Sequence, residues 1–227
     1  MAKLFFVGVT IGMPIVFLVY AVALRYVGTI LLGMVAFVLS QMVIRLPALE
    51  FLASESSTYQ LWHVTKPVVM MLFLAFTAGL VEELARWIFM RYLMKRWSFQ
   101  SGVIFGMGHG GVEAVLLVGI PMLGSTTLML QPQMLVLSGI ERIFAMAIHI
   151  CLSLIVLIGV RKRAFRYCMY AIFIHTLINF ISGSLAKTQS PVVVELVLAL
   201  LTAALMAYTI RMIWRNSDDE KMYGFIR

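Results

Sequence analysis

Two adjacent glutamates, Glu82 and Glu83, lie in an apolar stretch from Pro67 to Phe89 that is long enough to cross a lipid bilayer. A charged side chain at the centre of a bilayer costs about 3 kcal/mol on insertion scales, so such residues are rare unless they have a function. Arg86 follows on the same side of the expected helix and can pair with one of the two carboxylates. The second carboxylate then needs another cation, a metal or a proton, which favours a functional site.

The composition is that of a polytopic membrane protein. Hydrophobic residues make up 62% of the 227 positions and charged residues 12%, more apolar surface than a water-soluble domain of this size needs. We therefore expect an all-α bundle of about seven spanning helices of about 20 residues each, in a single membrane domain over residues 1–227. The expected spans are Leu4–Leu24, Val27–Ile44, Val68–Met90, Phe99–Ile120, Met134–Val160, Tyr167–Leu185 and Val192–Ile213.

The net charge of +8 reflects membrane topology and does not indicate a nucleic-acid partner. Lysines and arginines gather where three of the apolar runs end, around residues 91–96, 161–166 and 211–227. By the positive-inside rule these regions are cytoplasmic, which places the C-terminus inside the cell and, with an odd number of spans, the N-terminus outside. The first run is expected to remain as an anchor in the cell membrane, in contact with its lipids. Pro47–Lys66 is expected to form an extracytoplasmic loop with a short interfacial helix.

Three histidines also lie inside apolar runs. Glu113 follows His109 by four residues, so its carboxylate lies on the same helix face and could fix the imidazole tautomer. His175 and Asn179 have the same spacing, although this pair could equally join two helices through hydrogen bonds. His149 is isolated and could be a packing residue or part of a site. The four glycines around His109 permit close approach of another backbone.

The depth of these residues indicates one common site. Counted at about 1.5 Å per residue from the basic helix ends, Glu82, His109, His149 and His175 lie at about 12 to 18 Å, near the bilayer midplane. Packing residues on separate helices would have little reason to share this level. A glutamate and histidines gathered in a dry pocket can activate water for hydrolysis. The water is expected to enter from the cytoplasmic half.

Five blocks of the chain carry motifs. They are Glu82-Glu83-Leu84-Ala85-Arg86-Trp87, Tyr92-Leu93-Met94-Lys95, Gly106-Met107-Gly108-His109-Gly110-Gly111-Val112-Glu113, Glu141-Arg142-Ile143-Phe144 with His149, and His175. The region from about residue 68 to 185, the expected catalytic core, thereby resembles the YhfC family of bacterial intramembrane peptidases. More distantly it is similar to the type II CAAX prenyl protease and bacteriocin-processing superfamily, whose Phe-xxx-His and His-xxx-Asn motifs match Phe105 with His109 and His175 with Asn179.

The resemblance implies an intramembrane endopeptidase that cuts a peptide or membrane-protein substrate in or near the bilayer. Glu82 would activate water and His109 would hold it, while His175 and Asn179 would face the developing oxyanion. Four other polar residues complete the expected catalytic set: Glu83, Arg86, Glu113 and His149.

One difference from the prenyl proteases leaves the choice of base open. Here two residues, not three, separate the glutamate pair from Arg86. This turns Arg86 by about 100° around the helix, because each residue of an α-helix advances by that angle. Either Glu82 or Glu83 could therefore be the base.

Metal dependence is also open at this point. Zinc could be held by one carboxylate and three histidines, which are Glu82, His109, His149 and His175. The HExxH motif is absent from the sequence, and the prenyl-protease resemblance slightly favours metal-free glutamate chemistry. Zinc remains possible, but no cofactor is favoured.

Two other functions remain as alternatives. Intramembrane Glu and His residues are also typical of small proton-coupled transporters, but the sequence lacks the paired broken helices and the inverted repeat of such carriers. In a non-catalytic scaffold or immunity protein, the polar residues would serve only helix association.

Overall fold

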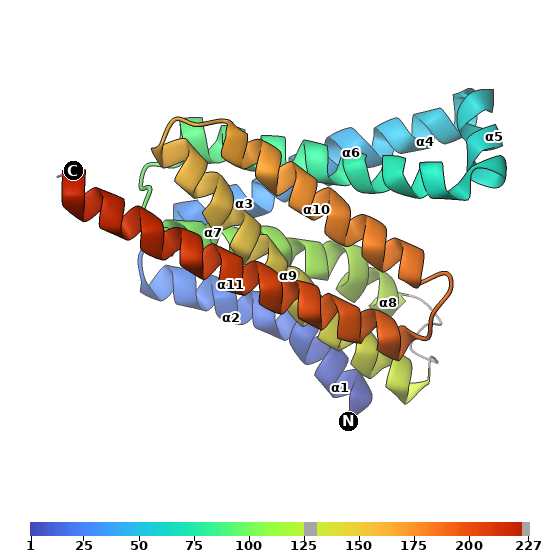
Figure 1. Cartoon of the computed structure of the whole chain (residues 1–227). Helices are drawn as coiled ribbons and strands as arrows, with labels where there is room; N and C mark the ends of the chain where they lie inside the picture. Colours follow the sequence, from blue (N-terminus) through green and yellow to red (C-terminus); the bar gives the residue numbers. More distant parts are fainter. Residues whose placement is uncertain (125–130, 224–227) are drawn as a thin grey trace.

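The chain forms a bundle of long helices, as the sequence predicts (Figure 1). The computed structural model describes residues 1–124 and 131–223, with residues 124 and 217–223 described as helical backbone only. Seven helical stretches in this part of the chain are long and apolar enough to cross a membrane. They are Ala2–Ala23, Val27–Glu55, Pro67–Leu93, Phe99–Leu123, Pro132–Arg161, Arg166–Leu185 and Pro191–Asn216. No strand occurs in the described ranges, and the all-α fold is confirmed.

Several spans combine α-helical segments with short π-helical segments, here labelled η. The first four spans consist of α1 (Ala2–Val7), η1 (Gly8–Gly12) and α2 (Met13–Ala23); α3 (Val27–Phe37), η2 (Val38–Arg45) and α4 (Leu46–Glu55); α6 (Pro67–Ile88) and η3 (Phe89–Leu93); and α7 (Phe99–Glu113), η4 (Ala114–Gly119) and α8 (Ile120–Gly124). The last three are α9 (Pro132–Arg161), α10 (Arg166–Leu185) and α11 (Pro191–Tyr223). Proline begins α6, α9 and α11, where its missing N–H is not needed.

The region Pro47–Lys66 is helical, and the expectation of a loop is wrong there. α4 extends the second span to Glu55, and α5 (Ser57–Thr65) follows at once. The Ser56 side chain starts α5 by accepting a hydrogen bond from the Tyr59 backbone N–H at 3.2 Å. Neither helix contains a buried residue, and the pair projects at the end of the bundle that also holds the N-terminus (Figure 1). The short helix that was expected in this region is present as α5.

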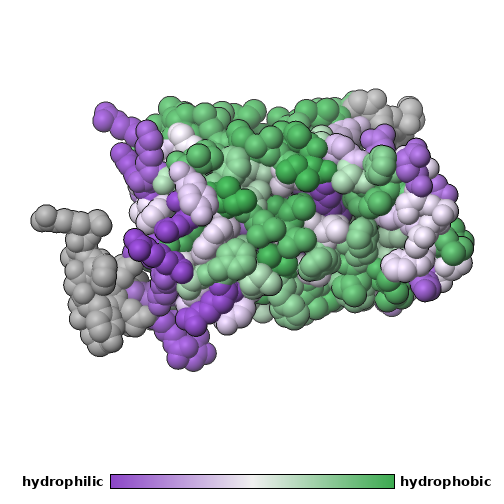
Figure 2. Space-filling view, turned by 90° about the horizontal axis from the view of Figure 1, so that it is seen from above, coloured by the Kyte–Doolittle hydropathy of each residue, from purple (hydrophilic) through white to green (hydrophobic). Residues whose placement is uncertain are grey.

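The surface of the bundle is that of a membrane protein. Figure 2 shows hydrophobic residues across the middle of the molecule and hydrophilic residues at its two ends. Large apolar side chains such as Val16, Phe173 and Leu200 are more than 60% exposed. Such exposure is unfavourable in water but not against lipid tails, which are themselves apolar. The apolar band therefore fits the hydrocarbon layer.

Glycines in α7 bring three helices into backbone contact at the centre of the bundle. A Cβ atom on Gly108 would lie 2.2 Å from the carbonyl oxygen of Ile30 in α3, and one on Gly106 would lie 2.6 Å from the Cα atom of Ile150 in α9. α7 therefore packs tightly between α3 and α9. The close approach expected around His109 is confirmed, and it places that imidazole against α9.

We expect Gly108→Ala to destabilise the bundle, because the new methyl group would meet the Ile30 carbonyl oxygen of α3. Overpacking of this kind typically costs about 1–3 kcal/mol, so the variant should unfold at a lower temperature when circular dichroism is followed in detergent. Gly28→Ala is the matched control, since its added methyl would have no described atom of another helix within 4 Å. Equal unfolding temperatures for the two variants would contradict the close packing of α7.

Candidate functional site

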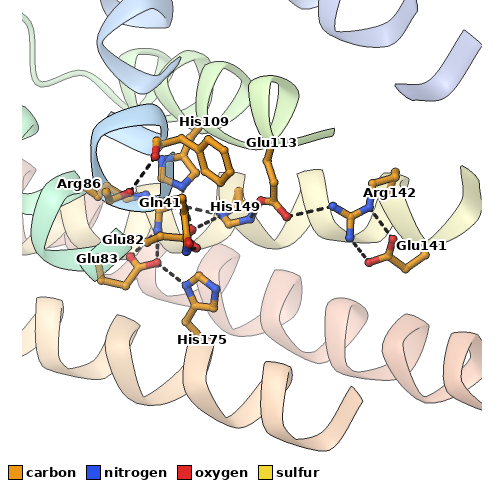
Figure 3. Close-up of polar contacts among 12 residues, drawn as sticks. Gln41, Glu82, Glu83, Arg86, His109, Glu113, Glu141, Arg142, His149 and His175 are labelled. Carbon is orange, nitrogen blue, oxygen red and sulfur yellow. Dashed lines mark hydrogen bonds and ion pairs between the residues drawn. The ribbon is translucent and has the colours of Figure 1, made fainter. Parts of the chain in front are cut away.

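Glu83 is the carboxylate that anchors the centre of the site. It lies on α6, is fully buried, and accepts hydrogen bonds from Arg86 through both of its oxygens (Figure 3). His175 of α10 also contacts it, with 2.8 Å between Nδ1 and Glu83 Oε1. Because a carboxylate only accepts, His175 Nδ1 carries the proton and Nε2 is the nitrogen left for other partners. Both oxygens of Glu83 are therefore occupied by protein donors.

Glu82 faces a different set of partners. Its Oε2 atom lies 3.0 Å from His109 Nε2 and 4.0 Å from His149 Nδ1, and its Oε1 atom accepts a hydrogen bond from Gln41. The rings of the two histidines lie close together, with their centroids 4.8 Å apart. Of the two glutamates, Glu82 is thus the one directed at the histidine pair.

The contacts of His149 fix its tautomer. Its Nδ1 atom lies 3.0 Å from Arg86 Nη2, and because a guanidinium only donates, this nitrogen accepts. Nε2 then carries the proton and lies against Glu113 Oε2, with which it is paired. His149 therefore directs its Nδ1 atom toward Arg86 and Glu82.

The four-residue spacing suggested that Glu113 orients His109, but the structure shows other partners for this carboxylate. Its described partners are His149 and Arg142, the latter at 2.9 Å between Nη1 and Oε1. Both partners come from α9, which packs against α7 through Gly110: a Cβ there would lie 3.2 Å from His149 Cβ. Glu113 therefore pairs with residues of α9, and the histidine that it contacts is His149.

A metal ion would fit between Glu82, His109 and His149. One ligand atom from each lies within 4.8 Å of the others, and a carboxylate with two imidazoles is a donor set that catalytic zinc uses. His109 also has a buried Nδ1 atom with no hydrogen-bond partner among the described residues. Binding through His149 Nδ1 would require that nitrogen to exchange Arg86 for the metal.

A cavity of about 440 Å³ leads away from Glu82, His149 and His175 between α9, α10 and α11. Its lining residues recur every three or four positions, so each helix presents one face. On α10 they are His175, Ile178, Asn179, Ser182 and Gly183, with Ala186 directly after the helix, and on α9 they are Glu141, Arg142, Ala145, Ile148 and His149. The cavity reaches the surface at Gln189 and Pro191, which are exposed. Asn179 thus lies one turn beyond His175 on the same wall.

The expected opening toward the basic helix ends is wrong for this cavity. The four residues that were expected to share one depth do meet, but the cavity extends from them toward the connection between α10 and α11. The basic half of the bundle is filled by buried apolar side chains of the main core, including Met90, Met94, Leu157 and Val160. Helical rise correctly gave the depth of the site in the bundle. The side from which the site can be reached depends instead on which half of the bundle is filled by apolar side chains.

Gln41 is the site residue that sequence reasoning missed. It lies in η2, is 4% exposed, and donates to Glu82. The same rule that singled out Glu82 applies to it, because a polar side chain in an apolar span needs a partner. Its spacing of four residues from Arg45 was a further available signal.

Comparison with known proteins identifies the family. A family model described as YhfC intramembrane metalloprotease matches residues 5–130 and 121–201. The chain belongs to the YhfC family. It is 31% identical over 192 residues to the uncharacterized membrane protein YhfC of Bacillus subtilis (strain 168), a match that covers 70% of this chain and 71% of that one. No solved structure matches the chain. The YhfC match includes every residue of the Glu82, His109 and His149 cluster, whereas the prenyl-protease likeness remains limited to short motifs.

We expect Arg86→Met to destabilise the protein strongly, because it leaves Glu83 as a buried carboxylate without its ion-pair partner. Removing one member of a buried pair typically costs about 3–5 kcal/mol. The double variant Glu83→Gln/Arg86→Met removes both charges and should recover much of the loss, as judged by thermal unfolding in detergent. If the single variant were as stable as the double variant, the ion pair would not anchor the site.

Proposed function

We propose that this YhfC protein is an intramembrane metallo-endopeptidase that hydrolyses a peptide bond in or beside the bilayer. The observation that carries the proposal is the convergence of Glu82, His109 and His149 at the buried end of a cavity. The description of the family as an intramembrane metalloprotease supports it. The donor set and this description favour zinc over metal-free chemistry. In this proposal Glu82 is a zinc ligand and not a free base.

The surrounding residues suit this role. When bound, zinc would polarise a water molecule and the peptide carbonyl. Glu113 is paired with His149 Nε2 and so leaves Nδ1 as the nitrogen that could coordinate a metal. Arg142 holds Glu113 in place from the cavity side.

The wall of the cavity offers groups for the substrate carbonyl. The Nδ1–H group of His175 donates to Glu83, so its Nε2 atom would donate to the oxyanion that forms on the carbonyl only when the imidazole is protonated. Asn179 lines the same wall one turn away and adds an amide donor. These two residues keep the role that the prenyl-protease resemblance implies for them.

Transport and scaffolding are less well supported. A carrier of the known kind would show paired broken helices and an inverted repeat, which the sequence lacks. A scaffold would need neither a cavity nor a cluster of donor atoms. Hydrolysis makes use of both features.

Purified protein is expected to carry about one zinc per chain, as measured by elemental analysis. Glu82→Gln and His109→Ala should each lose most of the zinc and all proteolysis while remaining folded in detergent, because they remove ligands. His63→Ala is the control, since His63 lies exposed on α5. Cleaved peptides would be found by comparing the proteomes of membranes that carry wild-type protein or Glu82→Gln.

Two outcomes would contradict the proposal. Cleavage that persists in Glu82→Gln and His109→Ala would show that Glu82 and His109 do not carry the activity. Cleavage by wild-type protein that persists after complete removal of zinc by a chelator would favour metal-free glutamate chemistry instead.

The side of access follows from the cavity and the charges together. The cavity opens at the end of the bundle opposite to the basic regions around residues 91–96 and 161–166. If the positive-inside rule holds, the opening lies on the extracytoplasmic side. The proposed substrate therefore reaches the site from outside the cell membrane, between α9, α10 and α11.

Single cysteines can test this side. In a Cys151→Ala/Cys168→Ala background, Ser182→Cys should react with a membrane-impermeant thiol reagent that is added outside intact cells, because Ser182 lines the cavity. Ser153→Cys is the control and should not react, since Ser153 is fully buried in α9. Reaction of Ser182→Cys only from the cytoplasmic side would reverse the proposed topology.

A further inference from the structure

A glutamine from the second span reaches the carboxylate at the centre of the site. Gln41 is buried, and its Nε2 atom donates to Glu82 Oε1 (Figure 3). The other oxygen of the carboxylate, Oε2, lies 3.0 Å from His109 Nε2. One bond on each oxygen fixes both the position and the rotation of the carboxylate plane.

The orientation of the Gln41 amide is itself fixed. Arg45 Nη1 lies 3.1 Å from Gln41 Oε1, and a guanidinium can donate only to the amide oxygen. The amide NH₂ group must then point the other way, toward Glu82. Without Arg45 the two ends of the amide could exchange places.

Arg45 is held by α6, the helix that also carries Glu82. Its Nη2 atom donates to the backbone carbonyl of Leu74 at 2.8 Å, and its Nε atom donates to Thr77 Oγ1 at 3.2 Å. Gln41 and Arg45 both belong to the π-helical segment η2. Such segments are rare and occur frequently at functional sites, and this one directs two polar side chains at α6.

We propose that Gln41, oriented by Arg45, is a positioning residue that holds Glu82 Oε1 so that Oε2 faces the two histidines. The inference rests on the proposed function, because it takes Glu82 as a ligand of the metal site. Partners that orient a metal ligand typically contribute 10- to 100-fold to metal affinity or activity. The second span, which contributes no ligand to the cluster, would therefore control how well the cluster binds.

Zinc affinity measures this role without a known substrate. Gln41→Met removes the N–H donor while keeping a side chain of similar length, and it should weaken zinc binding by about 10- to 100-fold in competition with a chelator. Ser40→Ala is the matched control: Ser40 is equally buried in η2, but its hydroxyl bonds only the Phe37 carbonyl of its own helix. Zinc affinity in Ser40→Ala should be that of the wild type.

A double-variant comparison tests whether Arg45 acts through Gln41. Arg45→Met should weaken zinc binding less than Gln41→Met, and the double variant should bind like Gln41→Met alone, because a relay loses its effect once either member is removed. Additive losses would show that Arg45 acts independently and would overturn the relay. Wild-type zinc affinity in Gln41→Met would overturn the proposal as a whole.

A second readout separates this inference from the metal assignment. In protein labelled with ¹⁵N-histidine, the His109 resonances can be identified by their loss in His109→Ala. Gln41→Met should shift them in zinc-free protein, because Glu82 can then rotate away from His109 Nε2, and Ser40→Ala should not. Unshifted resonances would overturn the positioning role. A wild-type protein that binds no zinc but shows the shift would overturn only the metal part of the proposed function.

Discussion

The buried ion pair between Glu83 and Arg86 is the interaction on which the centre of this membrane protein depends. It neutralises one of two adjacent carboxylates at a depth where an unpaired charge is unfavourable. It also joins three helices, because Glu83 contacts His175 of α10 and Arg86 contacts His149 of α9. With this pair satisfied within the protein, Glu82 is left as the carboxylate that can serve a ligand or a reaction.

Close helix packing gives the remaining geometry. In lipid, no hydrophobic force drives helices together, so association depends on van der Waals contact and on hydrogen bonds. Gly106 and Gly110 let α9 approach α7 at backbone distance, which brings the rings of His109 and His149 to 4.8 Å. The glycines of α7 and the two histidines, His109 of α7 and His149 of α9, are therefore parts of one arrangement. The glycines set the helix separation that brings the two rings together.

The sequence predicts the level of the site better than its contacts. Hydropathy gives the seven spans because each must cover the hydrocarbon layer, and helical rise then gives the common depth of Glu82, His109, His149 and His175. Which polar groups meet depends on the direction of side chains on neighbouring helices, and that information is not local. For this reason the partner of Glu113 was misassigned, Gln41 was missed, and the cavity was expected at the other end of the bundle.

The change in character along α9 explains where water can reach. This helix is the central one. In an apolar stretch of 18 residues, 72% of its residues are buried, compared with 50% or less in the corresponding stretches of the other spans. The part of α9 up to His149 presents Glu141, Arg142 and His149 to the cavity, whereas the part from Cys151 to Val160 is fully or almost fully buried in the bundle. Because neighbouring helices pack closely around that second half, no polar path continues past His149 among the described residues. A site at this boundary has the cavity on one side and a dry apolar core on the other. Oriented charges and dipoles act most strongly in such an environment.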